Sequence, residues 1–306
     1  MHKRYFIILV GVILGLITLG IFVNRKFFTI GGMERVNILI LGKSGAGHAG
    51  PDLTDTLILA SVALNKPEIS LISIPRDLWI PEIRAKINSA YYWGGTELAD
   101  SLVEKIIGQS VDYTLVINFS GFKDVVDAVG GIEVGVERSF TDTKYPIAGK
   151  ENDLCDGDKE FKCRYETLSL VQGGQKMDGE LALKYFRSRN GDNGENTDLA
   201  REARQQKVIT AIKNEVLSVG SLINFSRDIK IYKALKASVE TNIDRKAGLV
   251  LAQRLFLARD NIASYVFPDD LLVSPPVSAR YDNQYVFIPK AGDWSEFQNW
   301  VKSILF

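Results

Sequence analysis

Three apolar runs follow one another near the start of the chain, at residues 36–42, 54–64 and 68–75. Apolar side chains fill these runs almost without interruption, which is typical of strands that are buried on both faces of a sheet. Further along, strand patterns alternate with segments whose apolar residues have helical spacing, as at 96–108 and 197–218. We therefore predict an α/β fold with a mixed central β-sheet flanked by helices.

The N-terminal segment has a different character. Residues 5–23 carry no charge and are about long enough to cross a roughly 30 Å hydrocarbon layer as a helix. A cleaved signal peptide would have a shorter apolar region followed by small residues, whereas NRKFF follows here. We predict a single transmembrane helix at 5–23 that stays attached to the protein.

The parts on either side of this helix predict its orientation. Basic residues flank both ends, so the positive-inside rule does not decide. The segment before this helix is very short and the part of the chain after it is large, which favours export of the part after it. We predict a cytoplasmic head at 1–4, a linker at 24–34 and one extracytoplasmic domain at 35–306, which places the protein at the cell membrane.

The overall charge bears on the class of partner. The chain has 37 basic and 37 acidic side chains. This balance gives no support to nucleic-acid binding, which requires a basic surface. We predict no nucleic-acid partner.

The two cysteines, Cys155 and Cys163, lie in the polar stretch LCDGDKEFKCRY, which we expect to be an exposed loop. His2 and His48 are the only histidines, so the sequence does not favour a zinc site. In an oxidising exterior the two cysteines can form a disulfide, and the alternative is two free thiols. We predict the disulfide.

The first apolar run ends in Gly42-Lys43-Ser44, which raises the question of a nucleotide phosphate loop. Such a loop needs an earlier glycine, because that residue lets the backbone curl round the phosphates before lysine reaches them. Asn37 occupies the position, and an exported domain would lack ATP and GTP. The sequence therefore does not favour a nucleotide site.

Arginines gather where predicted elements end. Arg76 directly follows a buried strand, at the carboxyl end where α/β sheets bind ligands. A guanidinium group can bind two phosphate oxygens at once and stays charged, so a cluster of arginines predicts a polyphosphate site. The alternative is ordinary ion pairs with carboxylates such as Asp77 and Glu195. A second group surrounds the loop between two predicted helices: Arg187, Arg189, Arg201, Arg204 and Gln205.

Carboxylates near the second strand are candidate metal ligands. A pyrophosphate site usually also holds a divalent cation through carboxylates. Asp55 leads into the second strand, and Asp52 precedes it by three residues. The alternative is that Asp52 forms a turn and Asp55 caps the end of a strand.

A series of motifs runs in order along nearly the whole chain after the apolar N-terminal segment. They are NILILG, LTDTLILASV, ISLISIPRD, KINSAYYWGG, DYTLVINFSGFKDVVDAVGGIEV, LALKYFRSR, DLAREARQQKVI and YVFIP. Each motif alone is weak, but in this order they are highly specific. The chain resembles the extracytoplasmic domain of the LytR-CpsA-Psr (LCP) family.

The resemblance implies a phosphotransferase. LCP enzymes take a glycopolymer from a polyprenyl-pyrophosphate carrier and join it through a phosphodiester to a hydroxyl of peptidoglycan, releasing polyprenyl phosphate. It further implies Mg²⁺ as cofactor, an apolar tunnel for the lipid tail, and the membrane, the lipid-linked glycan and peptidoglycan as partners. The alternative is a membrane-anchored, non-catalytic protein that binds polyprenyl-phosphate lipids.

The resemblance also assigns roles to the residues above. Arg76, Asp55, Arg187 and Arg201 are expected to be catalytic, and Asp55 is expected to bind magnesium together with Asp52. The residues expected to bind the pyrophosphate are Arg76, Lys86, Arg187, Arg189, Arg201, Arg204 and Gln205.

Two motifs depart from the family pattern. Many members end the first strand in Gly-x-Asp and begin the second with Arg-Ser-Asp-Thr, whereas this chain has GKS at 42–44 and LTDT at 53–56. One carboxylate and one arginine are therefore absent from their usual places. Asp52 or His48 is a candidate replacement for the carboxylate, and Lys43 for the positive charge.

Overall fold

The structure is a computed structural model that describes residues 34–45, 50–216 and 239–306. Among these residues, no helix combines the length and the apolar character needed to cross a membrane. The predicted transmembrane helix at 5–23 lies outside the described residues, and so does His48.

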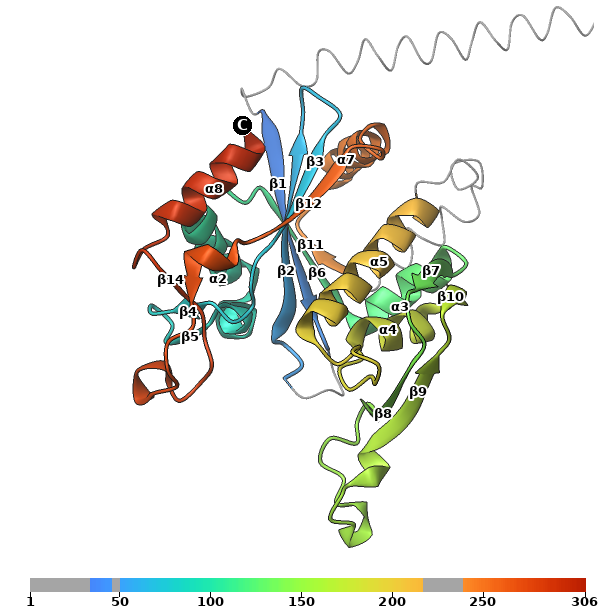
Figure 1. Cartoon of the computed structure of the whole chain (residues 1–306). Helices are drawn as coiled ribbons and strands as arrows, with labels where there is room; N and C mark the ends of the chain where they lie inside the picture. The colour runs from blue at the N-terminus through green and yellow to red at the C-terminus, as the bar shows by residue number, and fades with distance from the viewer. Residues whose placement is uncertain (1–33, 46–49, 217–238) are drawn as a thin grey trace, which may run out of the picture.

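A six-stranded mixed sheet forms the centre of the protein (Figure 1). The three predicted apolar runs are its strands β1, β2 and β3, which pair antiparallel in sequence order. Strand β6 lies parallel to β1, and β12 lies parallel to β3. The predicted mixed sheet is thus confirmed. In spatial order the strands are β11 (Val239–Thr241), β6 (Tyr113–Asn118), β1 (Arg35–Lys43), β2 (Thr54–Ala63), β3 (Ile69–Ser73) and β12 (Ile262–Val266).

The register brings several chain segments to one edge of this sheet. Lys43, at the end of β1, pairs with Thr54 at the start of β2 and with Asn118 at the end of β6. Ser73, at the end of β3, pairs with Ile58 of β2. The carboxyl ends of β1, β3 and β6 therefore share an edge, here called the site edge, with the first residues of β2.

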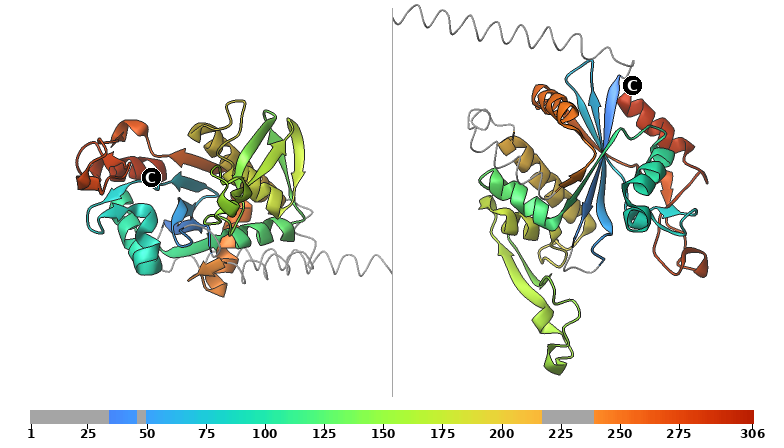
Figure 2. Two further views of the ribbon diagram at one scale, coloured as in Figure 1. Left: turned by 90° about the horizontal axis from the view of Figure 1, so that it is seen from below. Right: turned by 180° about the vertical axis from the view of Figure 1, so that it is seen from behind.

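Helices cover both faces of the sheet, as the views in Figures 1 and 2 show. Helices α2 (Ala90–Ile107) and α8 (Ser295–Leu305) pack on one face, over Leu39, Leu41 and Leu59 in the largest apolar core. The other face is covered by α3 (Phe119–Ala128), α4 (Gly179–Arg187), α5 (Asp198–Val216) and α7 (Arg245–Leu257).

Most helix ends follow the sequence signals. Helix α2 ends at Gly108, the last residue of the segment 96–108, because this residue adopts the left-handed conformation (φ 68°) that favours glycine. Helix α5 is capped by the Thr197 hydroxyl, which accepts a hydrogen bond from the backbone N–H of Ala200. At the other end of α2, Gly94 and Gly95 interrupt the helical geometry.

Smaller elements surround the central sheet. Of the YVFIP motif, only the last two residues form a strand. The two-stranded pairs are β4 (Trp79–Ile80) with β5 (Ala85–Lys86), β7 (Ile132–Val136) with β10 (Gly173–Met177), β8 (Phe140–Pro146) with β9 (Tyr165–Leu170), and β13 (Leu272–Val273) with β14 (Ile288–Pro289). Short 3₁₀ helices lie at Ile87–Ser89, Cys155–Gly157, Lys162–Arg164, Asp269–Leu271 and Ala279–Tyr281.

The β8–β9 hairpin forms an arm that projects from the body of the protein (Figure 1). Its tip carries both cysteines, joined by a disulfide with the Cα atoms of Cys155 and Cys163 5.5 Å apart. The predicted exposed loop and its disulfide are confirmed. The two strands of the arm were not predicted, and the base of the arm lies next to the site described below.

Thiol titration of the exported protein tests the disulfide. Under denaturing, non-reducing conditions we expect no reaction with a thiol reagent, because the two cysteines of the chain are joined to each other. After reduction both should react. Two reactive thiols before reduction would contradict the bridge.

Candidate functional site

A pocket of about 270 Å³ opens at the site edge, on the face of the sheet that carries α3 and α4. Ser44 and Asn118 line it from the ends of β1 and β6, and Arg187 lines it from the end of α4. Tyr145 contributes from the base of the β8–β9 arm. The pocket therefore lies where open α/β sheets bind ligands.

Arg187 is the cation in this pocket that is best placed to meet an anion. Helix α4 is fixed at its start by Asp178, which accepts a hydrogen bond from the backbone N–H of Leu181, and ends at Arg187. The guanidinium lies 4.1 Å from the ring centre of Phe119 and donates a hydrogen bond of 3.3 Å to the Tyr145 hydroxyl. No carboxylate among the described residues pairs with it. Aromatic rings and a hydroxyl thus hold the charge without neutralising it.

Tyr145 is a pocket residue that sequence reasoning missed. Burial raises the pKa of its hydroxyl to about 12, although the nearby Arg187 guanidinium acts in the opposite direction. The hydroxyl is therefore protonated at physiological pH. No sequence pattern around residue 145 pointed to this role, because the β8–β9 hairpin that brings the residue to Arg187 was itself not predicted.

The other charges in the pocket are largely paired. Lys123 and Glu180 form an ion pair of 3.1 Å, and Lys184 and Glu166 form one of 2.8 Å. Helix α3 begins at the pocket with Asn118 as its cap, and a helix N-terminus favours negative charge. The pocket thus offers one arginine without a described acidic partner, next to a helix N-terminus.

A second group of predicted residues meets at the same edge of the sheet. Asp55 is the extra residue of a β-bulge in β2, since Gly42 pairs with Thr56 and Lys43 pairs with Thr54. Such bulges redirect a side chain, and the Asp55 carboxylate forms an ion pair with Arg76. The structure thus brings Asp55 of β2 together with Arg76, which follows the end of β3.

Asp77 connects Lys86 to this group. Its carboxylate lies 3.4 Å from Arg76 Nε and 2.6 Å from Lys86 Nζ. Burial alone would lower the pKa of Arg76, but the two carboxylates Asp55 and Asp77 outweigh it and the pKa is raised. Two cations and two carboxylates therefore form one compact cluster, and Asp77 takes part although it was predicted only as a possible neutralising neighbour.

Lys43 contacts the other predicted metal ligand. Its ammonium lies 2.8 Å from the Asp52 carboxylate and donates a hydrogen bond of 3.3 Å to the Tyr91 hydroxyl. Tyr91 in turn donates to Glu240. Burial acts to lower the pKa of Lys43, but the hydrogen bonds to Asp52 and Tyr91 raise it overall. Lys43 is therefore a fixed positive charge at the end of β1.

The two predicted metal ligands are both exposed and both paired with a cation. Asp52 forms its ion pair with Lys43 and Asp55 with Arg76, and 45% and 46% of the two side chains are exposed. Mg²⁺ commonly binds one or two carboxylates together with substrate phosphates. Both carboxylates suit such a ligand set, and both assignments stay predictions. Within the described part of the chain, the one group close enough to hold a metal is Asp153 with Cys155 and Cys163, whose sulfurs are in the disulfide.

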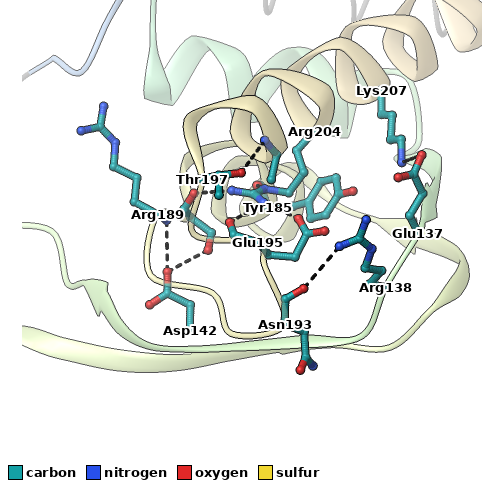
Figure 3. A network of polar contacts seen from close by, with 12 residues as sticks. Glu137, Arg138, Asp142, Tyr185, Arg189, Asn193, Glu195, Thr197, Arg204 and Lys207 are labelled. Atoms are coloured by element: carbon teal, nitrogen blue, oxygen red, sulfur yellow. Dashed lines mark hydrogen bonds and ion pairs between the residues drawn. The ribbon is translucent and has the colours of Figure 1, made fainter.

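Arg204 lies in the interior instead of the pocket, which corrects the prediction that it binds the pyrophosphate. Only 2% of the residue is exposed. Its guanidinium donates hydrogen bonds to the backbone carbonyls of Tyr185, Ser188 and Glu195 and to the Glu195 carboxylate, at 2.5–3.2 Å (Figure 3). Arg204 therefore fixes the segment between α4 and α5, as the alternative of an ion pair with Glu195 anticipated.

Asp142 fixes the same segment from the other side. The side chain is fully buried, and one carboxylate oxygen accepts hydrogen bonds from the Ser188 hydroxyl and from the backbone N–H groups of Arg189 and Asn190. In Figure 3 the side chain of Arg189 points away from Arg204. Asp142 was not predicted, because an aspartate in a hairpin strand carries no sequence signal for this role.

The remaining predicted residues stand apart from the pocket lining. Arg189 is exposed, Arg201 and Gln205 are partly buried, and none of them is among the residues that line the pocket. Arg201 and Gln205 lie one turn apart on α5. Their roles at a pyrophosphate site stay predictions.

Taken together, these features define an α/β protein with a mixed sheet and an arginine-containing pocket at the carboxyl ends of its strands, a setting suited to an anion. The LytR_cpsA_psr family matches residues 24–303. The chain therefore belongs to this family.

Relatives with named activities and a solved structure agree with this assignment. The polyisoprenyl-teichoic acid–peptidoglycan teichoic acid transferase TagU of Bacillus cereus is 28% identical over 214 residues, covering 69% of this chain and 61% of that protein. TagU of Bacillus subtilis is 30% identical over 223 residues, covering 71% and 63%. The chain thus spans about three fifths of the length of these transferases. The crystal structure of Bacillus subtilis TagV has a TM-score of 0.64 at 26% identity, covering 89% of this chain and 97% of that one.

Replacing Arg204 by methionine tests its structural role. We expect the free energy of unfolding to fall by about 3–5 kcal/mol, because the substitution leaves the buried Glu195 carboxylate without its partner. Urea unfolding measures the change. The matched control is Arg138→Met, which alters an exposed arginine of the same region and should cost about 0.5 kcal/mol or less. Equal effects of the two substitutions would contradict the buried interaction.

Proposed function

We propose that the protein is a phosphotransferase that moves a glycopolymer from a polyprenyl-pyrophosphate carrier to a hydroxyl of peptidoglycan and releases polyprenyl phosphate. The observation that carries this proposal is Arg187, a partly buried guanidinium in a pocket at the site edge with no described carboxylate partner. The names of the transferases that the chain resembles support the same reaction class.

The proposed step is a displacement at phosphorus. The acceptor oxygen attacks the phosphorus next to the glycan, its proton leaves, and the bond from this phosphorus to the bridging oxygen breaks. Negative charge then grows on the bridging and non-bridging oxygens. Positioned cations stabilise such charge without a covalent intermediate on the protein, which is the role proposed for Arg187 and Arg76. We propose that Arg189 and Arg201 extend this charge along the pyrophosphate and that the Gln205 amide donates a hydrogen bond to it.

Lys86 and Asp77 are proposed to support Arg76. The ion pairs through Asp77 hold the Arg76 side chain at the end of β3. A guanidinium that is already oriented loses little entropy when it binds a phosphate. Arg76 is therefore proposed to meet a phosphate that approaches from the site edge in an orientation already set by Asp77.

Mg²⁺ is proposed as a cofactor, with Asp55 as its protein ligand. When bound, it would supply additional positive charge to the phosphate oxygens. The Asp55 carboxylate is paired with Arg76 in the structure. Asp55 would therefore have to release Arg76 when Mg²⁺ binds, or bind both cations at once.

The cellular setting of the proposal follows from the sequence. A helix at 5–23 would hold the protein in the cell membrane, with residues 1–4 in the cytoplasm and the described domain outside. The lipid carrier is membrane-bound and peptidoglycan is extracytoplasmic, so this placement gives the site access to both partners. An apolar tunnel for the lipid tail remains part of the proposal.

A non-catalytic lipid-binding protein is the second candidate. It is favoured by the ion pairs of both predicted metal ligands, Asp52 with Lys43 and Asp55 with Arg76. Such a protein would bind a polyprenyl-pyrophosphate glycan and would not turn it over. Release of polyprenyl phosphate that depends on a peptidoglycan acceptor distinguishes the two functions.

Arg187→Ala tests the transferase proposal. With a polyprenyl-pyrophosphate glycan, a peptidoglycan acceptor and Mg²⁺, we expect release of polyprenyl phosphate to slow on the order of 100-fold, as when one charge-stabilising donor is removed. The matched control is Arg259→Ala, since Arg259 also stacks on an aromatic ring but precedes β12 at the opposite edge of the sheet. It should retain the wild-type rate. Lipid binding without any release by the wild type would support the second candidate.

Removal of divalent cations tests the role of Asp55. We expect a chelator to suppress release and added Mg²⁺ to restore it. Asp55→Asn should raise the Mg²⁺ concentration needed for half-maximal activity, because the amide binds the cation more weakly than the carboxylate. Asp282→Asn, which alters a carboxylate paired with Arg84 and outside the pocket lining, should leave that concentration unchanged. A reaction insensitive to chelation would contradict the cofactor proposal.

A further inference from the structure

Tyr145 has a hydroxyl whose donor capacity is not used within the described protein. The residue is 3% exposed and lines the pocket at the site edge. Its oxygen accepts the hydrogen bond from Arg187 Nη1. A phenol can accept and also donate one hydrogen bond, and no described group accepts the proton of this hydroxyl. The unused donor lies beside the guanidinium assigned to the anion.

The position of Tyr145 is well determined by its strand. The pairing of β8 with β9 shifts by one residue between Asp142 and Tyr145, which marks a β-bulge. Asp142, on the near side of the shift, is fully buried and bonded to the segment after α4. Tyr145 resumes the pairing opposite Glu166. Strand β8 therefore fixes both the segment that follows Arg187 and the hydroxyl that orients its guanidinium.

The protonation state suits a donor. Burial raises the pKa of Tyr145 to about 12, so the phenol keeps its proton under physiological conditions. A phosphate oxygen is a strong acceptor, and hydrogen bonds to charged groups are stronger than those between neutral groups. A carboxylate or phosphate bound by Arg187 would bring such an acceptor to the site.

We propose that Tyr145 is a substrate-binding residue that donates a hydrogen bond to the same phosphate group that Arg187 binds. The inference rests on the proposed function, because it takes the ligand to be the pyrophosphate of a lipid-linked glycan. Tyr145 and Arg187 then form one unit: the hydroxyl orients the guanidinium and both bind the anion. The phenol remains protonated and takes no part in proton transfer.

Tyr145→Phe tests this inference directly, because it removes the hydroxyl and keeps the ring beside Arg187. With farnesyl pyrophosphate as probe, calorimetry should show binding about 10-fold or more weaker than in the wild type, as expected for loss of a hydrogen bond to a charged group. The matched control is Tyr185→Phe. Tyr185 is also buried, with its pKa likewise raised to about 12, but it lines a different pocket. Its loss should change binding less than about twofold.

The other outcomes distinguish failure of this inference from failure of the proposed function. Unchanged thermal stability of Tyr145→Phe, together with weaker binding, supports direct contact with the ligand. Equal binding by Tyr145→Phe and the wild type would overturn the inference and leave the proposed function standing. No binding by the wild type would overturn both. Should Tyr145→Phe unfold, a crystal structure of the wild type with farnesyl pyrophosphate gives a second test. A phosphate oxygen within hydrogen-bond distance of the Tyr145 hydroxyl is expected, and a hydroxyl without such a contact would overturn the inference.

Discussion

The buried guanidinium of Arg204 is the interaction on which the candidate site depends most. The segment between α4 and α5 lies beyond both helices, so its backbone groups need partners from elsewhere. Arg204 supplies them to the carbonyls of Tyr185, Ser188 and Glu195, and the Glu195 carboxylate balances its charge. Removing a single partner from such a buried pair is costly. The end of α4, which carries Arg187, is fixed as a result.

The arrangement of the strands determines which groups lie near Arg187. Parallel β1 and β6 end together, so Ser44, Asn118 and the start of α3 lie at the same edge as the end of α4. Most of the nearby charges neutralise one another, as Lys43 does with Asp52 and Lys123 with Glu180. Arg187 differs because rings and a hydroxyl surround it. The positive charge left in the pocket therefore comes from the pairing of the other charges more than from the number of arginines.

The sequence predicted the scaffold better than the site, for physical reasons. Runs such as residues 36–42 predicted strands correctly because burial on both faces leaves a continuous apolar pattern. The ends of the third predicted strand and of the helix before residue 189 also indicated where Arg76 and Arg187 lie, but their roles at a pyrophosphate stay predictions. Sequence spacing could not reveal which side of α5 faces the interior, so Arg204 was assigned to the ligand.

The β8–β9 arm is a part of the site that could not be predicted from the sequence. Its strands contain polar and charged residues, and the bulge between Asp142 and Tyr145 breaks the alternation that identifies a hairpin. Both residues act on Arg187 or on the segment after it through contacts more than 40 positions apart in sequence. Only the folded arrangement shows that the arm completes the pocket. The departures at 42–44 gain a physical meaning in the same way, since Lys43 neutralises Asp52.

A crystal structure with a bound polyprenyl pyrophosphate would test the central claim most directly. The account predicts a phosphate group in the pocket at the ends of β1 and β6, within hydrogen-bond distance of the Arg187 guanidinium. A phosphate bound elsewhere, for example in the pocket lined by Arg138 and Lys207 on the other side of the α4–α5 segment, would contradict it.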